Sequence, residues 1–443
     1  MSQQNVFSFC IFICMKPAQS YHFTNWGKNL RIRADAYVQP ATEAELIAAV
    51  RNHPHIRVVG TGHSWSDVFS TKGVLLNLDK YQRVLHLDKG NKTLTVQAGI
   101  KLWQLNEYLD KQGFALINLG SIAQQSIAGA ISTGTHGSGI RFQCLASQVL
   151  SFSLIDAKGE KRVLHKGTDE FNAAVISLGC LGVISEITLQ ITEAYRLHDK
   201  TYIEDFDSII HRIDELIAQN DHFKLWWMPP AREVVVYTYK RTQEPRNDSR
   251  LRQFMNDRVL SVLGYRTMVK IGNLKNSWRP AINQFLTNQL KKPIDRIEKS
   301  FKVFNVPEPP VHRETEWAFD VKDAKELLRG YKELLGNNKY TFNFIQEIRF
   351  TKGDDFWLSE CHGRDSIWIG VYNHEDHQWN DLHAYFEAFA VKWNGRPHWG
   401  KEFLVRKDYL QTSYPKYNDF IRLRKAVDPD GKFSNPLMEA IFD

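Results

Sequence analysis

Cysteine and long apolar runs are both scarce in this chain of 443 residues. The five cysteines include no C-x-x-C pair, which argues against a disulfide framework or a zinc ribbon and favours a reducing compartment, the cytoplasm. The one membrane-like run, residues 6–15 (VFSFCIFICM), has half of the ~20 residues that a spanning helix needs. Repeats, low-complexity tracts and a Walker A motif are also absent. We therefore expect neither an integral membrane protein nor a P-loop enzyme, and no metal site.

The composition is that of a globular protein, with 43% apolar and 24% charged residues. At roughly 100–200 residues per domain, the length predicts two or three domains. Fifty-seven Lys and Arg against fifty Asp and Glu leave a net charge of +7, too mild to indicate nucleic acid as a partner. Residues 1–20 are interpreted as an extension outside the fold. They are either a signal or anchor that lacks a preceding Lys or Arg, or an over-long start with Met15 as the initiator.

Residues 21–195 alternate short helix and strand patterns, which is typical of an α+β domain. Strands are predicted at 56–59, 74–78, 84–87, 94–99, 149–156 and 183–191, and a helix at 102–113. The pattern of predicted helices and strands changes near residue 196. Further strands are predicted at 223–227, 233–239, 341–350 and 366–372, and a helix at 382–392. Between them, residues 241–302 favour helix and carry fourteen Lys and Arg against five Asp and Glu, a net charge of +9.

Two glycine-rich loops stand out in the first domain, at residues 60–66 and 120–139. The first (GTGHSWS) follows a strand as a dinucleotide fingerprint does, and Asp79 stands near the place of a ribose-binding acid, but the third glycine is missing. The second has five Gly, six Ser or Thr and no charged residue over its twenty positions. Consecutive small residues let backbone N–H groups converge on an anion, so a phosphate cradle of another type stays open beside a reading as two plain turns.

Six short motifs in a fixed order carry a resemblance to a known family. V-G-T-G-H-S (59–64), N-L-G-S (118–121), S-T-G-T-H-G-S-G (132–139) and L-G-C-L-G-V (178–183) resemble the vanillyl-alcohol-oxidase-type FAD domain. E-I-R (347–349) and G-R-P-H-W-G-K (395–401) narrow the resemblance to the aldonolactone oxidases, with alditol oxidases as a related group. The resemblance covers roughly residues 21–443 and is weakest across 241–315.

The resemblance implies an α+β fold in two parts. A vanillyl-alcohol-oxidase/PCMH-type FAD-binding domain spans 21–195, and an α+β substrate (cap) domain built on an antiparallel sheet spans 196–415. Residues 416–443 are expected to pack back on the FAD domain. The implied activity is FAD-dependent oxidation of a primary or secondary alcohol of an L-gulono-1,4-lactone- or D-arabinono-1,4-lactone-type substrate. A hydride would pass to flavin N5, and O₂ would be reduced to H₂O₂.

His63 is the sharpest single prediction. Without context, a lone histidine in a loop is more often a polar surface residue. Beside the flavin's dimethylbenzene edge, a neutral imidazole can attack the 8α methyl carbon, and the resemblance implies a covalent histidyl–FAD bond. The other residues expected to bind FAD are Gly60, Thr61, Gly62, Ser64, Gly120, Ser121, Ser126, Gly129, Thr133, Gly134, Thr135, His136, Gly182, Val183 and Ile184.

Two residues of the second loop are given finer roles by the resemblance. Ser121 is expected to touch both the flavin and the substrate. Gly120 is expected to stand as a gatekeeper beside the flavin C4a–N5 edge, where glycine goes with reactivity toward O₂ and alanine with dehydrogenase behaviour.

Glu347 and Arg349 stand at i and i+2, so on a strand both point to one face, while their apolar neighbours point to the other. A structural ion pair is the plain alternative. As catalytic groups, Glu347 would take or orient the hydroxyl proton, and Arg349 with Lys401 would hold developing negative charge. Asn373 is a weaker candidate for a substrate contact.

Other interpretations stay open at this point. The enzyme could be an alditol oxidase, or an aldonolactone dehydrogenase that passes electrons to cytochrome or quinone. A protein of another class would use residues 241–302 to bind a membrane surface or nucleic acid on a degenerate flavin fold. Weak peripheral membrane association through 241–302 is also compatible with an oxidase in the cytoplasm.

Overall fold

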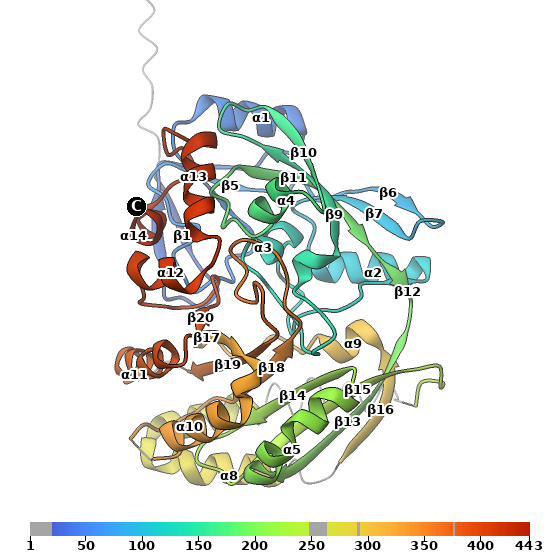
Figure 1. Ribbon diagram of the computed structural model, residues 1–443, viewed down its shortest axis with the longest axis vertical. Helices are drawn as coiled ribbons and strands as arrows, with labels where there is room; N and C mark the ends of the chain where they lie inside the picture. The colour runs from blue at the N-terminus through green and yellow to red at the C-terminus, as the bar shows by residue number, and fades with distance from the viewer. Residues whose placement is uncertain (1–19, 248–263, 290–292, 338, 375–376) are drawn as a thin grey trace, which may run out of the picture.

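The computed structural model describes residues 20–247, 264–289, 293–337, 339–374 and 377–443. The chain forms two domains, one above the other in Figure 1. Residues 20–195 and the C-terminal helices build the upper domain, and the described segments between them build the lower one. The predicted extension at 1–20 lies, except for Ser20, outside the described residues.

The upper domain contains a parallel sheet and an antiparallel sheet. The parallel sheet has the strand order β3-β5-β4, and the antiparallel sheet the order β10-β9-β11-β7-β6. Their strands are β3 (Ala36–Val38), β4 (Ile56–Val59), β5 (Val74–Asn77), β6 (Val84–Asp88), β7 (Thr93–Gln97), β9 (Val149–Ile155), β10 (Lys161–His165) and β11 (Val183–Gln190). Two short pairs are β1 (Tyr21–Thr24) with β2 (Arg31–Ala34), and β8 (Phe114–Ala115) with β12 (Thr192–Glu193).

Local sequence signals explain where the upper-domain helices begin and end. The Thr42 hydroxyl accepts the Glu45 N–H at 3.2 Å and starts the first helix, and Gly113 ends the second with φ +84°. These helices are α1 (Glu43–Asn52), α2 (Leu102–Gln112), α3 (Ile127–Ser132) and α4 (Asp169–Ala174), with a 3₁₀ turn at Leu145–Gln148. The loop expected over 120–139 therefore contains a helix, α3, because Ser126 caps six apolar and small residues.

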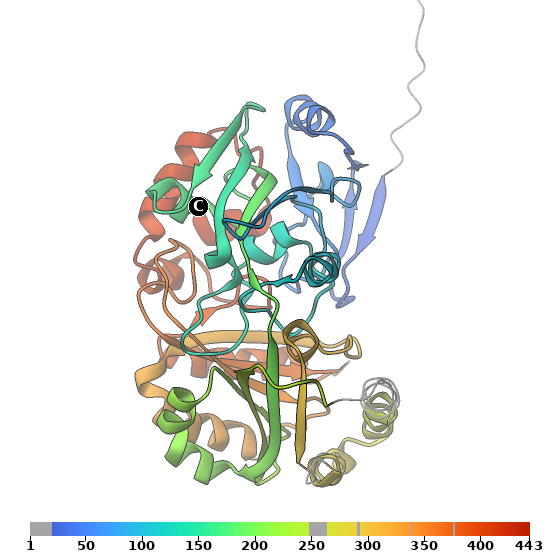
Figure 2. The ribbon, with the colours of Figure 1, turned by 90° about the vertical axis from the view of Figure 1, so that its right-hand side faces the viewer.

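An eight-stranded antiparallel sheet forms the lower domain, in the order β16-β13-β15-β14-β18-β19-β17-β20. Its strands are β13 (Arg196–Asp205), β14 (His222–Trp227), β15 (Glu233–Thr242), β16 (Ile294–Lys299), β17 (Arg313–Asp320), β18 (Gln346–Thr351), β19 (Ser366–Asn373) and β20 (Arg396–Pro397). Helices α5 (Phe206–Gln219) and α10 (Ala324–Gly336) lie on one side of the sheet, and α7 (Tyr265–Leu274) and α8 (Arg279–Gln289) on the other (Figure 2). The remaining helices are α9 (Ser300–Phe304), α11 (Trp379–Lys392), α12 (Lys407–Ser413), α13 (Tyr417–Val427) and α14 (Pro436–Phe442), with 3₁₀ turns at Asn276–Trp278 and Val321–Asp323.

Two predictions for the lower domain are corrected. The strand expected over 341–350 begins only at Gln346, because the ladders with β14 and β19 start there, and the Asn343 amide instead bonds the His374 carbonyl at 2.9 Å. Within the described part of 241–302, β16 is a strand rather than a helix, since it pairs with β13. Residues 248–263 of this basic segment lie outside the described residues.

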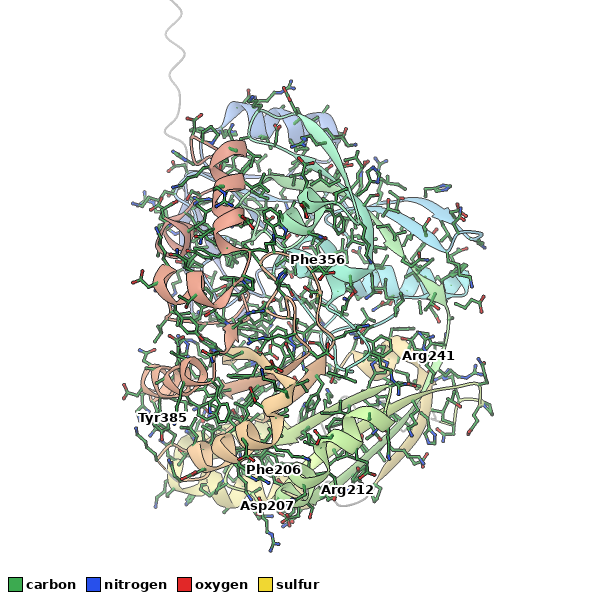
Figure 3. All side chains as sticks on the ribbon, in the orientation of Figure 1. Phe206, Asp207, Arg212, Arg241, Phe356 and Tyr385 are labelled. Atoms are coloured by element: carbon green, nitrogen blue, oxygen red, sulfur yellow. The ribbon has the colours of Figure 1, made fainter. Side chains whose placement is uncertain are left out.

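Two segments join the domains. After β18 the chain runs up into the upper domain, where Phe356 packs against Phe171 with ring centroids 6.2 Å apart (Figure 3). Near the C-terminus, the Ile56 N–H of β4 donates to the Lys432 carbonyl at 2.9 Å. The upper domain thus contains chain from both ends of the sequence.

The described cysteines, Cys144, Cys180 and Cys361, are free and buried. Among the helices that the structure describes, none has the length and apolar character needed to cross a bilayer.

Candidate active site

The first glycine-rich loop leaves the end of β4 as an open stretch of backbone. Gly62 has φ +70°, and a Cβ there would lie 2.9 Å from the Phe23 ring, so the position requires glycine. Within the described residues, the backbone N–H groups of 61–64 donate to no other protein atom. Successive N–H groups of this kind form an anion-binding concavity.

His63 is held on three sides. Its Nδ1 lies 2.8 Å from Thr61 Oγ1, its Nε2 lies 3.2 Å from Glu308 Oε1, and the Trp26 indole stacks on the ring at 5.5 Å with planes 16° apart. Burial lowers the pKa of His63, although the Glu308 carboxylate opposes this effect. The geometry therefore holds an oriented imidazole that is neutral at pH 7.

The two glycine-rich loops and the start of β11 surround a cavity of about 930 Å³, open mouth included. The predicted cofactor residues that line it are Gly60, Thr61, Gly62, His63, Ser64, Ser126, Gly129, Thr133, Gly182 and Ile184. Gly182 has φ +148°, and a Cβ there would collide with the Ile155 carbonyl. The positive φ and this close approach to the backbone of β9 explain why position 182 is glycine.

Six of the predicted cofactor residues do not line this cavity. They are Gly120, Ser121, Gly134, Thr135, His136 and Val183. Gly134 turns the chain out of α3 with φ +73°, and a Cβ there would collide with the Glu360 carboxylate, so the motif that follows α3 faces the lower domain. Val183 is 1% exposed and belongs to the core of the five-stranded sheet.

Among the cavity residues that the sequence analysis missed, four have charged or amide side chains: Arg57, Asp79, Lys101 and Gln125. Lys101 and Asp79 form an ion pair in the cavity wall, and Asp79 had been considered only for a Rossmann site. Gln125 Oε1 is buried without a hydrogen-bond partner. Its place in the uncharged loop was the available signal, whereas nothing near Lys101 in the sequence marked it.

The residues present fit the phosphate-rich part of a dinucleotide. The cavity wall offers the free N–H groups of 61–64 and glycines where the backbone comes closest to its neighbours. Backbone donors and small residues are the expected features of a pyrophosphate cradle.

A second group of predicted residues lies on the sheet of the lower domain. On β18, Arg349 donates to the Glu347 carboxylate, which also accepts from Lys224 Nζ at 3.1 Å and Trp226 Nε1 at 2.8 Å. The predicted shared face is confirmed. Burial raises the pKa of Glu347, but Arg349 and Lys224 outweigh it and hold the pKa at about 2. Such a carboxylate orients its neighbours well and accepts a proton poorly at neutral pH.

Lys401 connects this sheet with the first glycine-rich loop. Its Nζ lies 2.5 Å from Glu314 Oε2 on β17 and 4.3 Å from the centroid of the Trp65 ring. The Trp65 N–H donates to the Gly400 carbonyl at 2.8 Å. A Cβ on Gly400 would lie 3.5 Å from Ser64 Oγ, so the H-W-G-K segment packs directly on the cavity loop.

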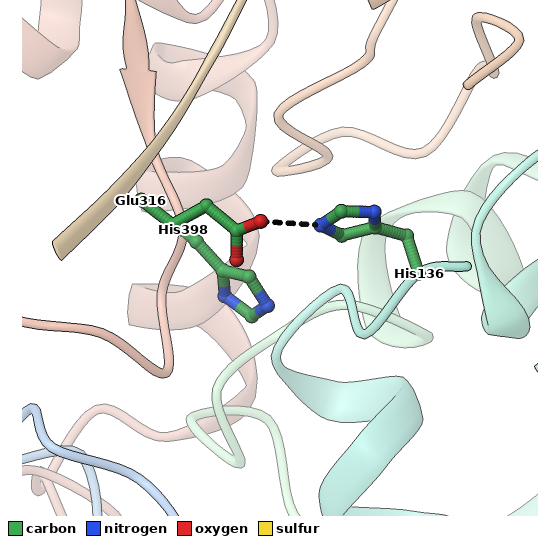
Figure 4. Close-up of side chains that lie close together, drawn as sticks. All are labelled: His136, Glu316 and His398. Atoms are coloured by element: carbon green, nitrogen blue, oxygen red, sulfur yellow. Dashed lines mark ion pairs between the residues drawn. The ribbon is translucent and has the colours of Figure 1, made fainter. Parts of the chain in front are cut away.

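Glu316, two residues beyond Glu314 on β17, belongs to a buried cluster with His136 and His398 (Figure 4). One donor atom from each lies within 4.8 Å of the others. His136 Nε2 and Glu316 Oε1 are 3.6 Å apart, and neither has a hydrogen-bond partner. His136 Nδ1 lies 2.9 Å from the Gly137 carbonyl, and His398 Nδ1 accepts the Gly400 N–H at 3.1 Å.

The charges around Glu316 decide between a metal and a proton in this cluster. Burial raises the pKa of Glu316, but His136, Arg349 and Lys401 more than offset it and hold the pKa well below its usual range. Two nearby permanent cations disfavour a divalent metal ion. We therefore interpret the cluster as a buried group of polar side chains that holds Glu316 as a carboxylate, and not as a metal site.

A proline-rich segment, residues 305–312, crosses from the lower domain to both glycine-rich loops. The Asn305 amide donates to the Gly120 carbonyl at 2.9 Å, and the Val306 N–H donates to the Ser121 carbonyl at 2.8 Å. The Trp65 Nε1–H donates to the His312 carbonyl at 2.6 Å. Gly120 and Ser121 are thereby held at the boundary between the domains.

Asn373 has a different environment. It ends β19, is fully buried, and its Oδ1 accepts the Asn343 N–H at 3.3 Å. This contact fixes the loop before β18 and supports a structural role for Asn373 more than a substrate contact.

Comparison with known proteins places both halves of the site in one family. A model of the D-arabinono-1,4-lactone oxidase family matches residues 187–441, more than half of the chain, and a model of the FAD binding domain matches residues 34–164. The chain belongs to the D-arabinono-1,4-lactone oxidase family. The predicted aldonolactone oxidase resemblance is confirmed, and this family member is a flavoprotein oxidoreductase that binds FAD.

Individual relatives agree with the family match. The L-gulono-1,4-lactone dehydrogenase of Mycobacterium tuberculosis is 32% identical over 93% of this chain and 97% of its own. The L-gulonolactone oxidase of Mus musculus is 31% identical over 95% of this chain and 98% of its own. Among solved structures, the cholesterol oxidase of Brevibacterium sterolicum superimposes with a TM-score of 0.82 over 96% of this chain and 97% of that chain, at 14% identity. That likeness concerns the fold, and the predicted α+β class with an antiparallel cap sheet is confirmed.

Proposed function

We propose that this family member oxidises a hydroxyl group of a sugar-derived lactone, of the L-gulono-1,4-lactone or D-arabinono-1,4-lactone type, to a carbonyl. The observation that carries the proposal is the Trp65 N–H bond to the Gly400 carbonyl at 2.8 Å. It joins the cavity that fits FAD to the segment that bears Lys401. The names of the relatives support the substrate class.

FAD would be held by the cavity residues described above, with its pyrophosphate on the N–H groups of 61–64 and near Ser126, Gly129 and Thr133. When bound, FAD supplies the hydride acceptor, flavin N5. The interface position of Gly120 and Ser121 supports the proposal that the reacting end of the cofactor and the substrate meet there.

Side chains of the cap sheet would act on the substrate. The alcohol carbon loses a hydride and its hydroxyl loses a proton. Lys401 and Arg349 would stabilise the negative charge that develops on oxygen. Glu347 would hold Arg349 and orient the hydroxyl, because a carboxylate with a pKa of about 2 is a weak base.

We further propose that His63 binds FAD covalently. The neutral, oriented imidazole at the cavity wall supports this assignment. A neutral ring nitrogen is the nucleophile that such a bond requires.

Dioxygen is the proposed electron acceptor, with H₂O₂ as the product, on the basis of Gly120. The second candidate is a dehydrogenase that uses cytochrome or quinone, because the Mycobacterium tuberculosis relative bears the name dehydrogenase.

One experiment separates these outcomes. One portion of the purified protein is precipitated with acid to test whether the yellow colour stays with the pellet. A second, native portion is assayed with a panel of aldonolactones and alditols. O₂ uptake with peroxide formation on a lactone supports the oxidase. Turnover only with an artificial acceptor supports the dehydrogenase, and turnover only on alditols overturns the lactone assignment.

A further inference from the structure

Glu308 reaches the His63 ring from the opposite domain, and neither the family match nor the predicted site gives it a role. We infer that Glu308 is a positioning residue for the covalent attachment of FAD to His63. The inference rests on the proposed histidyl bond and adds to it the group that selects the reactive nitrogen.

The contacts on the two ring nitrogens determine which one carries the proton. An ionised carboxylate only accepts hydrogen bonds, so Glu308 Oε1 at 3.2 Å places the proton of a neutral His63 on Nε2. Nδ1 then keeps its lone pair, which the Thr61 hydroxyl at 2.8 Å satisfies until a ligand displaces it. The stacked Trp26 indole restricts rotation of the ring. A carboxylate that orients a nucleophile's imidazole in this way is a recurring device in catalysis.

Other bonds, and not this contact, hold the backbone that carries Glu308. The proline-rich segment is attached through Asn305, Val306 and His312. The Glu308 side chain is 38% exposed, against 9% for His63. Replacing it should therefore leave both the fold and the cavity intact.

The attachment step balances with dioxygen as the oxidant. A bond forms between His63 Nδ1 and the 8α carbon, and one C–H bond of the methyl group breaks with loss of its proton. Glu308 receives the proton that leaves Nε2 as the alkylated ring becomes neutral. The two electrons released pass through FAD to dioxygen, which takes up the two protons and becomes H₂O₂.

The test compares three full-length proteins prepared without flavin and then mixed with FAD in air: wild type, Glu308→Gln and Glu193→Gln. Glu193 is a matched control, because it is an exposed carboxylate that pairs only with Lys92. Samples are denatured at intervals, and the covalent fraction is measured by intact mass. FAD bound before denaturation is measured by fluorescence quenching.

We expect attachment in Glu308→Gln to slow by at least 10-fold while FAD binding before denaturation stays at the wild-type level. Glu193→Gln should match wild type in both measurements. Attachment at the wild-type rate in Glu308→Gln overturns the inference alone, as does a loss of attachment that only parallels a loss of binding. A wild-type protein that releases all of its flavin overturns the histidyl bond itself and the inference with it.

Discussion

The FAD cavity and the charged face of the cap sheet are built in opposite ways. The cavity is made of backbone: free N–H groups at 61–64 and glycines at the closest approaches. The cap face is made of side chains, with Glu314 and Glu316 on β17, Glu347 and Arg349 on β18, and β19 between the two strands. A backbone site is damaged by an added Cβ, whereas a side-chain site is damaged by a changed charge.

The largest effect is expected from Glu347→Gln on the charged side. The variant keeps the shape but leaves Arg349 and Lys224 buried without their counter-charge. Breaking a buried pair in this way lowers the free energy of unfolding by about 3–5 kcal/mol. Losing one oriented charge at a reacting oxygen lowers kcat by roughly 100-fold or more. Urea unfolding and steady-state kinetics at pH 7 measure the two effects.

The stabilisation by the Glu347 carboxylate should depend on pH in a defined direction. The pKa of Glu347 falls from 4.5 to about 2 on folding, so its stabilisation is complete above 4.5 and is lost as the pH falls toward 2. The difference in the free energy of unfolding between wild type and Glu347→Gln should therefore become smaller as the pH falls. Glu326→Gln, which removes an exposed partner of Arg329, serves as the control, and an equal loss of stability there contradicts the explanation.

On the backbone side, His63→Ala should abolish covalent attachment and spare the fold. The other residues that line the proposed FAD cavity are not changed by the substitution. Flavin fluorescence of the denatured protein in a gel should vanish, while FAD stays bound in the native state. A mutant band that still fluoresces places the attachment on another residue.

Gly120→Ala adds one methyl group at the boundary between the two regions and tests whether it slows reoxidation by O₂. The new Cβ would lie 3.2 Å from the His136 carbonyl and 3.4 Å from Thr135 Cγ2, so it fits after a shift of a few tenths of an ångström. We expect slower reoxidation by O₂ and unchanged turnover with artificial acceptors, measured by stopped flow. Gly336→Ala, whose Cβ meets no atom within 4 Å, is the control. Equal reoxidation rates in wild type and Gly120→Ala would contradict the predicted gatekeeper role of Gly120.

The smallest effect concerns a surface outside both regions, residues 241–302. In its described part, Leu274, Trp278 and Phe285 are exposed beside basic residues. We expect weak docking on anionic vesicles, at ~1 kcal/mol per basic residue near the surface. Flotation should show binding at low salt that fades at high salt, as the screening length falls below ~8–10 Å. If the protein stays at the bottom of the gradient at both salt concentrations, the segment does not dock on membranes. It would then serve another purpose, such as a lid or a dimer contact.

The backbone half was the more predictable from sequence. Strands at 56–59 and 183–191, the helix closed by Gly113, and ten of the proposed cavity residues follow from contiguous motifs, in which local chemistry and position in the chain coincide. Gly134 to His136 do not line this cavity, because they follow the short helix α3, and their role in binding FAD stays a prediction.

The side-chain half was predictable only in part. The i, i+2 spacing revealed the shared face of Glu347 and Arg349, but their partners Lys224 and Trp226 come from a strand more than 120 residues earlier. The same spacing was present in Glu314 and Glu316 and went unused. No local pattern places Glu308 on His63, because that contact depends on a crossing 245 residues away in the chain.

The bonds of Arg57 have a consequence for the order of events during synthesis. This buried side chain lines the FAD cavity and donates to the carbonyls of Leu178 and Phe433, the latter 376 residues later in the chain. A nascent chain on the ribosome therefore carries an unfinished cavity wall until the segment around Phe433 has emerged.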